Sequence, residues 1–168
     1  MLHSLIVVLD TQGLVDLGFE ILSTGGTARK LSEAGIDVRL VSDVTQHPEI
    51  FDGRVKSLHP AIHGPLLARL HQEKDAKELT QLGYAPIRVV ACNLYPFGDA
   101  AAKTPPLSND ELLEMIDIGG PTMVRASAKN HQHVLIATNP ARYRRIKTTK
   151  PSRLDHHGNL FGRLNINR

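Results

Sequence analysis

Short, continuous apolar runs alternate along the chain with longer segments in which apolar residues recur at helical spacing. The runs are four to six residues long and rich in Val, Ile and Leu, which is typical of strands covered on both faces of a sheet. We therefore predict strands at residues 5–9, 19–22, 38–41, 87–92 and 134–137.

Helical segments lie between these strands. One runs over 28–34 and stops at Gly35, a second shows apolar spacing from 66 to 82 and stops at Gly83, and another starts at 122–128. A helix over 108–115 has the clearest start, because Ser108 and Glu111 have the spacing of a capping box. This alternation predicts an α/β fold, a doubly wound three-layer sandwich with a mostly parallel sheet.

The first predicted strand has an unusually short link to the second. A turn at 10–13 and the segment 14–18 are all that separate them, whereas neighbouring parallel strands need a crossover of about a dozen residues. We therefore expect a shortened first crossover helix. Either the first strand pairs abnormally, or the N-terminal segment does not fold properly.

Composition narrows the class of protein. The 168 residues, 41% hydrophobic and 22% charged, suit one globular domain with a sizeable core. No apolar run approaches the roughly 18 residues of a membrane span, and the apolar start lacks the length and basic lead of a secretory segment. We expect a cytoplasmic protein with no membrane association. Cys92 is the single cysteine, and its apolar surroundings predict a buried thiol without a redox role.

The net charge of +3 is unevenly distributed. Residues 147–168 contain five basic residues and one acidic residue, a balance of +4, which leaves 15 basic and 16 acidic residues, or −1, elsewhere. This near-neutral body argues against a nucleic-acid binder, although binding driven by the tail stays open as a third function class. We predict one domain over 1–146 and a disordered basic tail over 147–168.

A basic loop at 52–64 contains the first candidate chemistry. Arg54 and Lys56 flank Val55, so in an extended segment both cations project to one side and can bind an anion, with Ser57 as a neutral donor. A solvated surface loop explains the same residues equally well, so this stretch alone leaves both interpretations open.

A second candidate lies where a predicted strand leads into a helix, at Ser23, Thr24, Gly25, Gly26 and Thr27. Glycines let backbone amides face an anion, the helix N-terminus adds partial positive charge, and hydroxyls supply further donors, as a bound phosphate requires. A simple turn in which Thr27 caps the helix is the alternative.

His59 and His63 have the i, i+4 spacing of a metal-binding pair on a helix. Pro60 lies between them, however, and no third ligand is obvious in the sequence. We therefore predict no metal site, and no motif indicates a cofactor.

The basic loop resembles the signature G-R-V-K-[ST]-L-H-P of the inosine monophosphate cyclohydrolase domain, the N-terminal half of the bifunctional purine biosynthesis proteins. Four more blocks agree with that family in order and spacing, at 23–28, 92–97, 116–122 and 128–131. The resemblance extends from about residue 19 to residue 146. It implies a methylglyoxal-synthase-like fold and closure of 5-formamidoimidazole-4-carboxamide ribotide to inosine monophosphate with loss of water.

The resemblance also implies roles for individual residues and a small purine ribonucleotide as the partner, with a homodimer left open. Lys129 would be the proton donor and acceptor, and Asp117 would orient the carboxamide and pair with Lys129. Tyr95 and Lys56 would polarise the formyl oxygen. Contacts to phosphate, ribose and purine fall at Ser23, Thr24, Gly25, Gly26, Thr27, Arg54, Val55, Lys56, Ser57, Cys92, Asn93, Asp117 and Ile118.

Two departures from the family bear on function. Its first strand ends in a Ser-Asp-Lys triplet at the substrate phosphate, where this chain has Leu9, Asp10 and Thr11, so one hydroxyl and one cation are missing. After residue 146 the family continues toward a formyltransferase domain, which residues 147–168 do not resemble. The leading hypothesis is a cyclohydrolase, and the alternative is a non-catalytic nucleotide-binding variant or fragment. Methylglyoxal synthase is disfavoured, because its triose phosphate would leave the purine-contact blocks unused.

Overall fold

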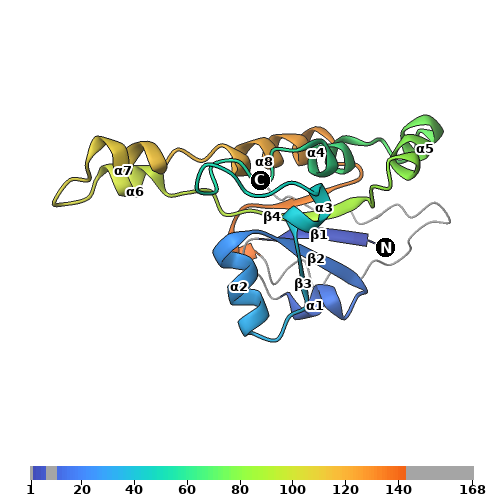
Figure 1. Cartoon of the computed structure of the whole chain (residues 1–168), viewed down its shortest axis with the longest axis horizontal. Helices are drawn as coiled ribbons and strands as arrows, with labels where there is room; N and C mark the ends of the chain where they lie inside the picture. The colour runs from blue at the N-terminus through green and yellow to red at the C-terminus, as the bar shows by residue number, and fades with distance from the viewer. Residues whose placement is uncertain (1, 7–10, 143–168) are drawn as a thin grey trace.

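The computed structural model describes residues 2–6 and 11–142, which form a five-stranded sheet in the order β3-β2-β1-β4-β5 (Figure 1). Every neighbouring pair in this sheet is parallel. The order runs outward from β1 in both directions, which makes the fold doubly wound, as predicted. The strands are β1 (Leu2–Ile6), β2 (Phe19–Ser23), β3 (Val38–Leu40), β4 (Ile87–Ala91) and β5 (Leu135–Ala137).

Helices cover both faces of the sheet. The helices α1 and α2 lie on one face, and α4 and α8 lie on the other (Figure 1), which confirms the three-layer sandwich. In the described part of the chain, no helix has the length and apolar character needed to cross a membrane. The helices are α1 (Gln12–Val15), α2 (Gly25–Glu33), α3 (Val41–Thr45), α4 (Pro60–Leu67), α5 (Glu73–Gln81), α6 (Phe97–Ala101), α7 (Asn109–Glu114) and α8 (Gly119–Lys129), followed by a short 3-10 helix, η1 (Pro140–Arg142).

Alternate side chains of the strands fill two separate cores. Leu22 of β2 and Val90 of β4 pack with buried residues of α4 and α8. Ile21 and Val89, one residue earlier on the same strands, pack instead with buried residues of α1 and α2. Successive strand residues point to opposite faces, so a sheet covered on both sides requires the continuous apolar runs seen in the sequence.

The first strand differs from its prediction. It spans Leu2–Ile6 rather than 5–9, and it pairs in parallel with β2, with Leu2 opposite Phe19. The link to β2 is therefore 7–18, about the dozen residues that a parallel crossover needs, so the alternative in which the first strand pairs abnormally is wrong. A local irregularity does interrupt the pairing with β4, between His3 and Ser4. The hydrophobic run could not locate the strand, because register is set by hydrogen bonds to its neighbours.

Two helices replace the single helical segment expected over 66–82. The helix α4 ends at Leu67, and α5 begins only at Glu73. Arg69 lies in the link between them, and its guanidinium donates to both carboxylate oxygens of Asp75 in α5, at 2.8 and 3.0 Å. These hydrogen bonds lower the pKa of Asp75 to about 2. The ion pair thus stabilises a bend that helical spacing alone does not reveal.

The predicted capping box is confirmed at the start of α7. The hydroxyl of Ser108 accepts from the backbone N–H of Glu111 at 3.3 Å, and the Glu111 carboxylate accepts from the backbone N–H of Ser108 at 2.8 Å. These contacts lower the pKa of Glu111. Neither α3 nor α6 was predicted, since each is a single short turn without helical spacing of its own.

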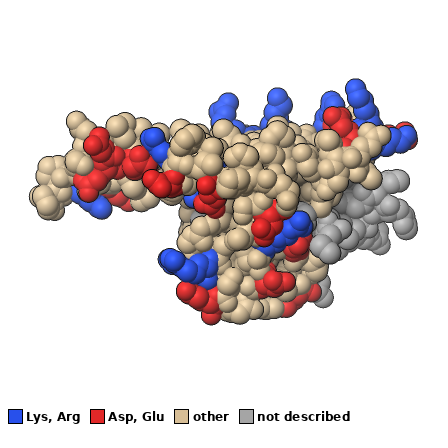
Figure 2. All heavy atoms as spheres, viewed as in Figure 1, with Lys and Arg blue, Asp and Glu red and all other residues tan. Residues whose placement is uncertain are grey.

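Residues 94–118, which we call the arm, contain α6 and α7 and project away from the sandwich (Figure 1). No residue of α7 is buried. Figure 2 shows acidic side chains gathered over the arm, in keeping with its formal composition of five carboxylates against Lys103. The predicted tail at 147–168 lies outside the described residues, as do Leu9 and Asp10.

Candidate nucleotide site

The motif blocks meet at one edge of the sheet. The strand order reverses between β1 and β4, and ligands of open parallel sheets bind at such a switch point, beyond the carboxyl ends of the strands. The glycine turn directly follows β2, and Cys92 and Asn93 directly follow β4. Two of the predicted binding segments therefore lie at the expected edge.

The glycine turn opens a helix without using the hydroxyl of Thr24 as a cap. The helix α2 begins at Gly25, whose φ of +49° is left-handed and favours glycine. Thr24 occupies the N-cap position and makes no side-chain capping hydrogen bond. Thr27 lies inside the first turn, so the alternative in which Thr27 caps the helix is wrong. Ser23 is buried at the end of β2.

The basic loop folds over this turn. Left-handed conformations at Phe51, Asp52 and Gly53 reverse the chain, and it returns through an isolated antiparallel bridge between Ile50 and Val55. The ammonium of Lys56 then lies 4.0 Å from the position that a Cβ on Gly25 would occupy. A cation from the loop and the N-terminus of α2 therefore converge, although they are 31 positions apart in sequence (56 − 25).

The same loop also contacts the N-terminus of α8. Ser57 is 5% exposed, and its hydroxyl oxygen lies 2.8 Å from the position of a Cβ on Gly119. Asp117 accepts a hydrogen bond from the backbone N–H of Gly120 at 2.8 Å, so its carboxylate caps α8. A Cβ on Gly120 would collide with that carboxylate. Asp117 therefore has a structural role at the start of α8, and one of its oxygens is already engaged.

The residues predicted to contact the purine and the formyl group differ in how accessible they are to a ligand. Burial, followed by the charge of Asp117, raises the pKa of Cys92 to about 11, so the thiol is neutral and close to Asp117. The backbone N–H of Cys92 donates to Ala137 at 2.9 Å, which leaves only its carbonyl for a purine. Tyr95 and Ile118 are 50% and 56% exposed. Both therefore offer free surface to a ligand.

Arg54 contacts the arm. Its guanidinium lies 3.3 Å from the carboxylate of Glu114, near the end of α7, and both side chains are more than half exposed. Sequence reasoning missed Glu114, because its pairing depends on how the arm and the loop approach one another. The predicted common orientation of Arg54 and Lys56 gives way to contacts with two different elements.

Lys129 lies apart from these residues. Asp117 precedes the first turn of α8, whereas Lys129 is the last residue of that 11-residue helix. At a rise of 1.5 Å per residue, the two ends of α8 are about 15 Å apart. The expected pairing of Asp117 with Lys129 within one chain is therefore wrong.

The two histidines of the basic loop have separate structural roles. The Nδ1 atom of His59 accepts from the backbone N–H of Ala61 at 3.1 Å and caps α4. Burial lowers the pKa of His63, and the backbone groups of His59 and Ser57 oppose that shift. Within residues 2–6 and 11–142, no group of three or more His, Cys, Asp or Glu side chains is placed to hold a metal ion.

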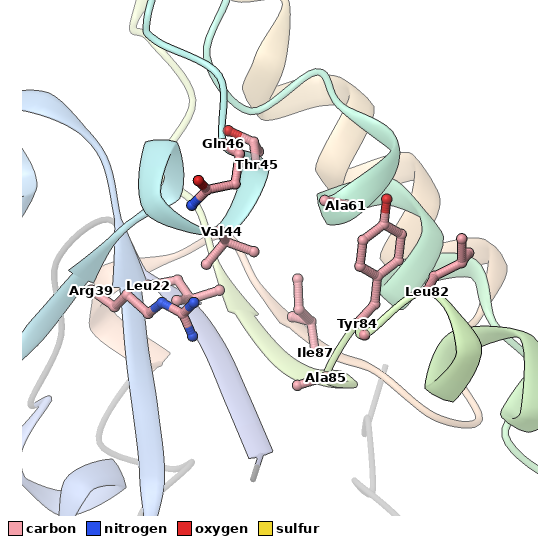
Figure 3. Close-up of a pocket in the computed structure, with 11 residues that line it drawn as sticks. Leu22, Arg39, Val44, Thr45, Gln46, Ala61, Leu82, Tyr84, Ala85 and Ile87 are labelled. Carbon is pink, nitrogen blue, oxygen red and sulfur yellow. The ribbon is translucent and has the colours of Figure 1, made fainter.

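A cavity of about 460 Å³ opens elsewhere, between α3, α4 and the segment before β4 (Figure 3). Leu22, Val44 and Ile87 contribute apolar surface, while Arg39 and Gln46 are polar. None of the predicted nucleotide contacts lines this cavity. The predicted site is instead the group of loops and helix N-termini at the strand ends.

This arrangement matches known proteins. Residues 8–122 match the family described as MGS-like domain. The chain belongs to this family. The match confirms the methylglyoxal-synthase-like fold, which the crystal structure of ForH shares at a TM-score of 0.71 and 31% identity, covering 88% of this chain and 78% of that chain.

Curated relatives agree with the resemblance in the sequence. The bifunctional purine biosynthesis protein PurH of Oceanobacillus iheyensis is 48% identical over 144 residues, covering 86% of this chain and 28% of the relative. PurH of Myxococcus xanthus is 54% identical over 132 residues, covering 79% of this chain and 25% of the relative. The chain therefore spans about a quarter of the length of these curated relatives.

Proposed function

We propose that this domain closes 5-formamidoimidazole-4-carboxamide ribotide to inosine monophosphate. The observation that supports this most strongly is the position of Lys56, whose ammonium lies against the Gly25 turn at the N-terminus of α2. An N-terminus with free amides and a nearby cation is the arrangement that binds a phosphate. The N-terminus of α8 lies against the other side of the same loop, through Ser57.

The reaction joins the carboxamide nitrogen to the formyl carbon. The formyl oxygen leaves as water and takes one proton from the carboxamide nitrogen and one from the formamido nitrogen. Such a step needs a polarised formyl oxygen and groups that move protons. We assign polarisation to Lys56 and Tyr95, and orientation of the carboxamide to the free oxygen of Asp117. The family motif alone supports Lys129 as the proton donor and acceptor, because α8 keeps Lys129 about 15 Å from Asp117 in this chain.

The test measures turnover and binding on the same variants. Lys129→Ala should lower turnover by about 100-fold to 10,000-fold while leaving the affinity for inosine monophosphate unchanged, as expected for a proton-transfer group. Lys56→Ala should weaken both. Unchanged turnover in Lys129→Ala would refute its role and leave proton transfer to the residues gathered around Asp117.

A non-catalytic nucleotide-binding domain is the second candidate. Thr11 favours it, because this residue stands where the family has a phosphate-binding lysine, and it is only 3% exposed at the start of α1. A chain that binds inosine monophosphate but forms no product from the formylated ribotide would support this alternative. Growth of the hypoxanthine absorbance with time would exclude it. A cytoplasmic location is part of the same proposal.

A further inference from the structure

The contact between Arg54 and Glu114 joins two segments that the proposed reaction uses separately. Arg54 belongs to the loop that also contains Lys56 and Ser57, and Glu114 lies three residues before Asp117. Their side chains are 64% and 61% exposed and meet through one contact of 3.3 Å. The arginine expected to bind phosphate is therefore paired with a carboxylate.

We propose that Glu114 tunes the affinity of the site for nucleotides by exchange: its carboxylate occupies Arg54 until the phosphate dianion of a nucleotide replaces it. This inference rests on the proposed function, since it assumes that the ligand is a nucleotide phosphate.

The energetics favour exchange with a phosphate dianion. An exposed ion pair contributes about 0–1 kcal/mol, so Glu114 is displaced at little cost. Hydrogen bonds from a guanidinium to phosphate are roughly twice as strong as neutral ones and are often bidentate. A nucleoside has no phosphate to bind Arg54, so the pair of Arg54 with Glu114 does not affect its binding. Glu114 would therefore lower the affinity for phosphorylated ligands and leave the affinity for nucleosides unchanged.

The experiment is calorimetric titration with inosine monophosphate, with inosine as the uncharged probe. Glu114→Gln keeps the shape of the side chain and should bind the nucleotide about 1.5-fold to 5-fold more tightly at low salt, the range expected for removal of an exposed pair. High salt should reduce this gain, because it weakens the pair in the unaltered protein. The affinity for inosine should not change.

Two controls separate exchange from a general change in charge. Asp110→Asn removes the same charge from the same helix, at a residue that is exposed, and should leave nucleotide affinity unchanged. In an Arg54→Ala background, Glu114→Gln should have no effect, because the pair no longer exists. Equal gains from Asp110→Asn and Glu114→Gln would overturn the inference, as would a weaker or unchanged affinity in Glu114→Gln.

The outcome also distinguishes this inference from the proposed function. Tighter binding in Glu114→Gln without turnover in any variant would support exchange and refute the cyclohydrolase. Normal turnover with no effect of Glu114→Gln on binding would refute exchange alone. A chain that binds no inosine monophosphate at all would overturn both.

Discussion

Replacing Gly26 with alanine tests whether the glycine turn binds phosphate or only turns the chain. A Cβ at this position would meet no atom within 4 Å, and the φ angle of Gly26 is not left-handed. Gly26 also lies in the first turn of α2. Folding alone therefore does not require glycine here, and Gly26→Ala should stabilise the protein by about 0.4–1 kcal/mol, because alanine reduces the freedom of the unfolded chain.

The affinity for nucleotide, in contrast to the stability, should fall in Gly26→Ala. A methyl group on Gly26 occupies space through which a phosphate approaches the backbone amides, and the loss of one charge-assisted hydrogen bond costs about 1.5–3 kcal/mol. We expect the affinity for inosine monophosphate to fall roughly 10-fold to 100-fold in calorimetry while the urea midpoint rises.

Gly98→Ala is the matched control for Gly26→Ala. Gly98 lies in α6, and a Cβ there also meets no atom within 4 Å. This variant should stabilise the fold without changing affinity. Equal affinity in Gly26→Ala and the unaltered protein would refute phosphate binding at the glycine turn and would show that the turn has only a structural role.

Three further predictions concern the surroundings of the site. Asn130→Ala should destabilise the protein by about 2–4 kcal/mol in urea unfolding, because the buried amide of Asn130 donates at 2.9 and 2.8 Å to two carbonyls at the end of α4. His131→Ala, at the exposed neighbouring residue, should change the stability little. Gly120→Ala should displace the Asp117 carboxylate from α8 and reduce both stability and nucleotide affinity, whereas unchanged values would show that the helix start relaxes freely. Cys92, with a pKa of about 11 against an ordinary 9.0, should react with iodoacetamide about 100-fold more slowly in the folded than in the unfolded protein. Because folding raises this pKa, the folded state favours the protonated thiol. The resulting contribution to the free energy of unfolding is fully present below pH 9 and is lost as the pH rises through about 11.

The chain sequence identified features that depend on neighbours in sequence. The capping box at Ser108 and Glu111 needs only a spacing of three residues, and it forms as predicted. The buried strands β2 and β4 also lie within a residue of their predicted positions, because burial on both faces leaves a continuous apolar run. The motif blocks were sufficient to predict the fold and the family.

Features that depend on distant segments were not predictable in this way. The position of β1 was misjudged, since strand register is fixed by hydrogen bonds to β2 and β4 rather than by the local run of apolar residues. The split of the 66–82 segment lies where the amide of Asn130, a residue far along the chain, donates to the carbonyls of Leu66 and Ala68 at the end of α4. The spacing of apolar residues along the chain does not show which distant residues will contact a segment.

The sequence by itself determined which residue types are available for phosphate and purine chemistry, and in what order they follow the strands. Only the tertiary structure decided which of them meet. It brought Lys56 to Gly25 and Ser57 to Gly119, and it separated Lys129 from Asp117 by the length of α8. The physical reason is that the position of each loop and helix end is set by the packing of the helices and strands that it connects. Contacts between distant segments of a doubly wound sheet therefore depend on the whole fold. A motif specifies which residues are present, whereas a binding site also requires that their side chains lie within contact distance of one another.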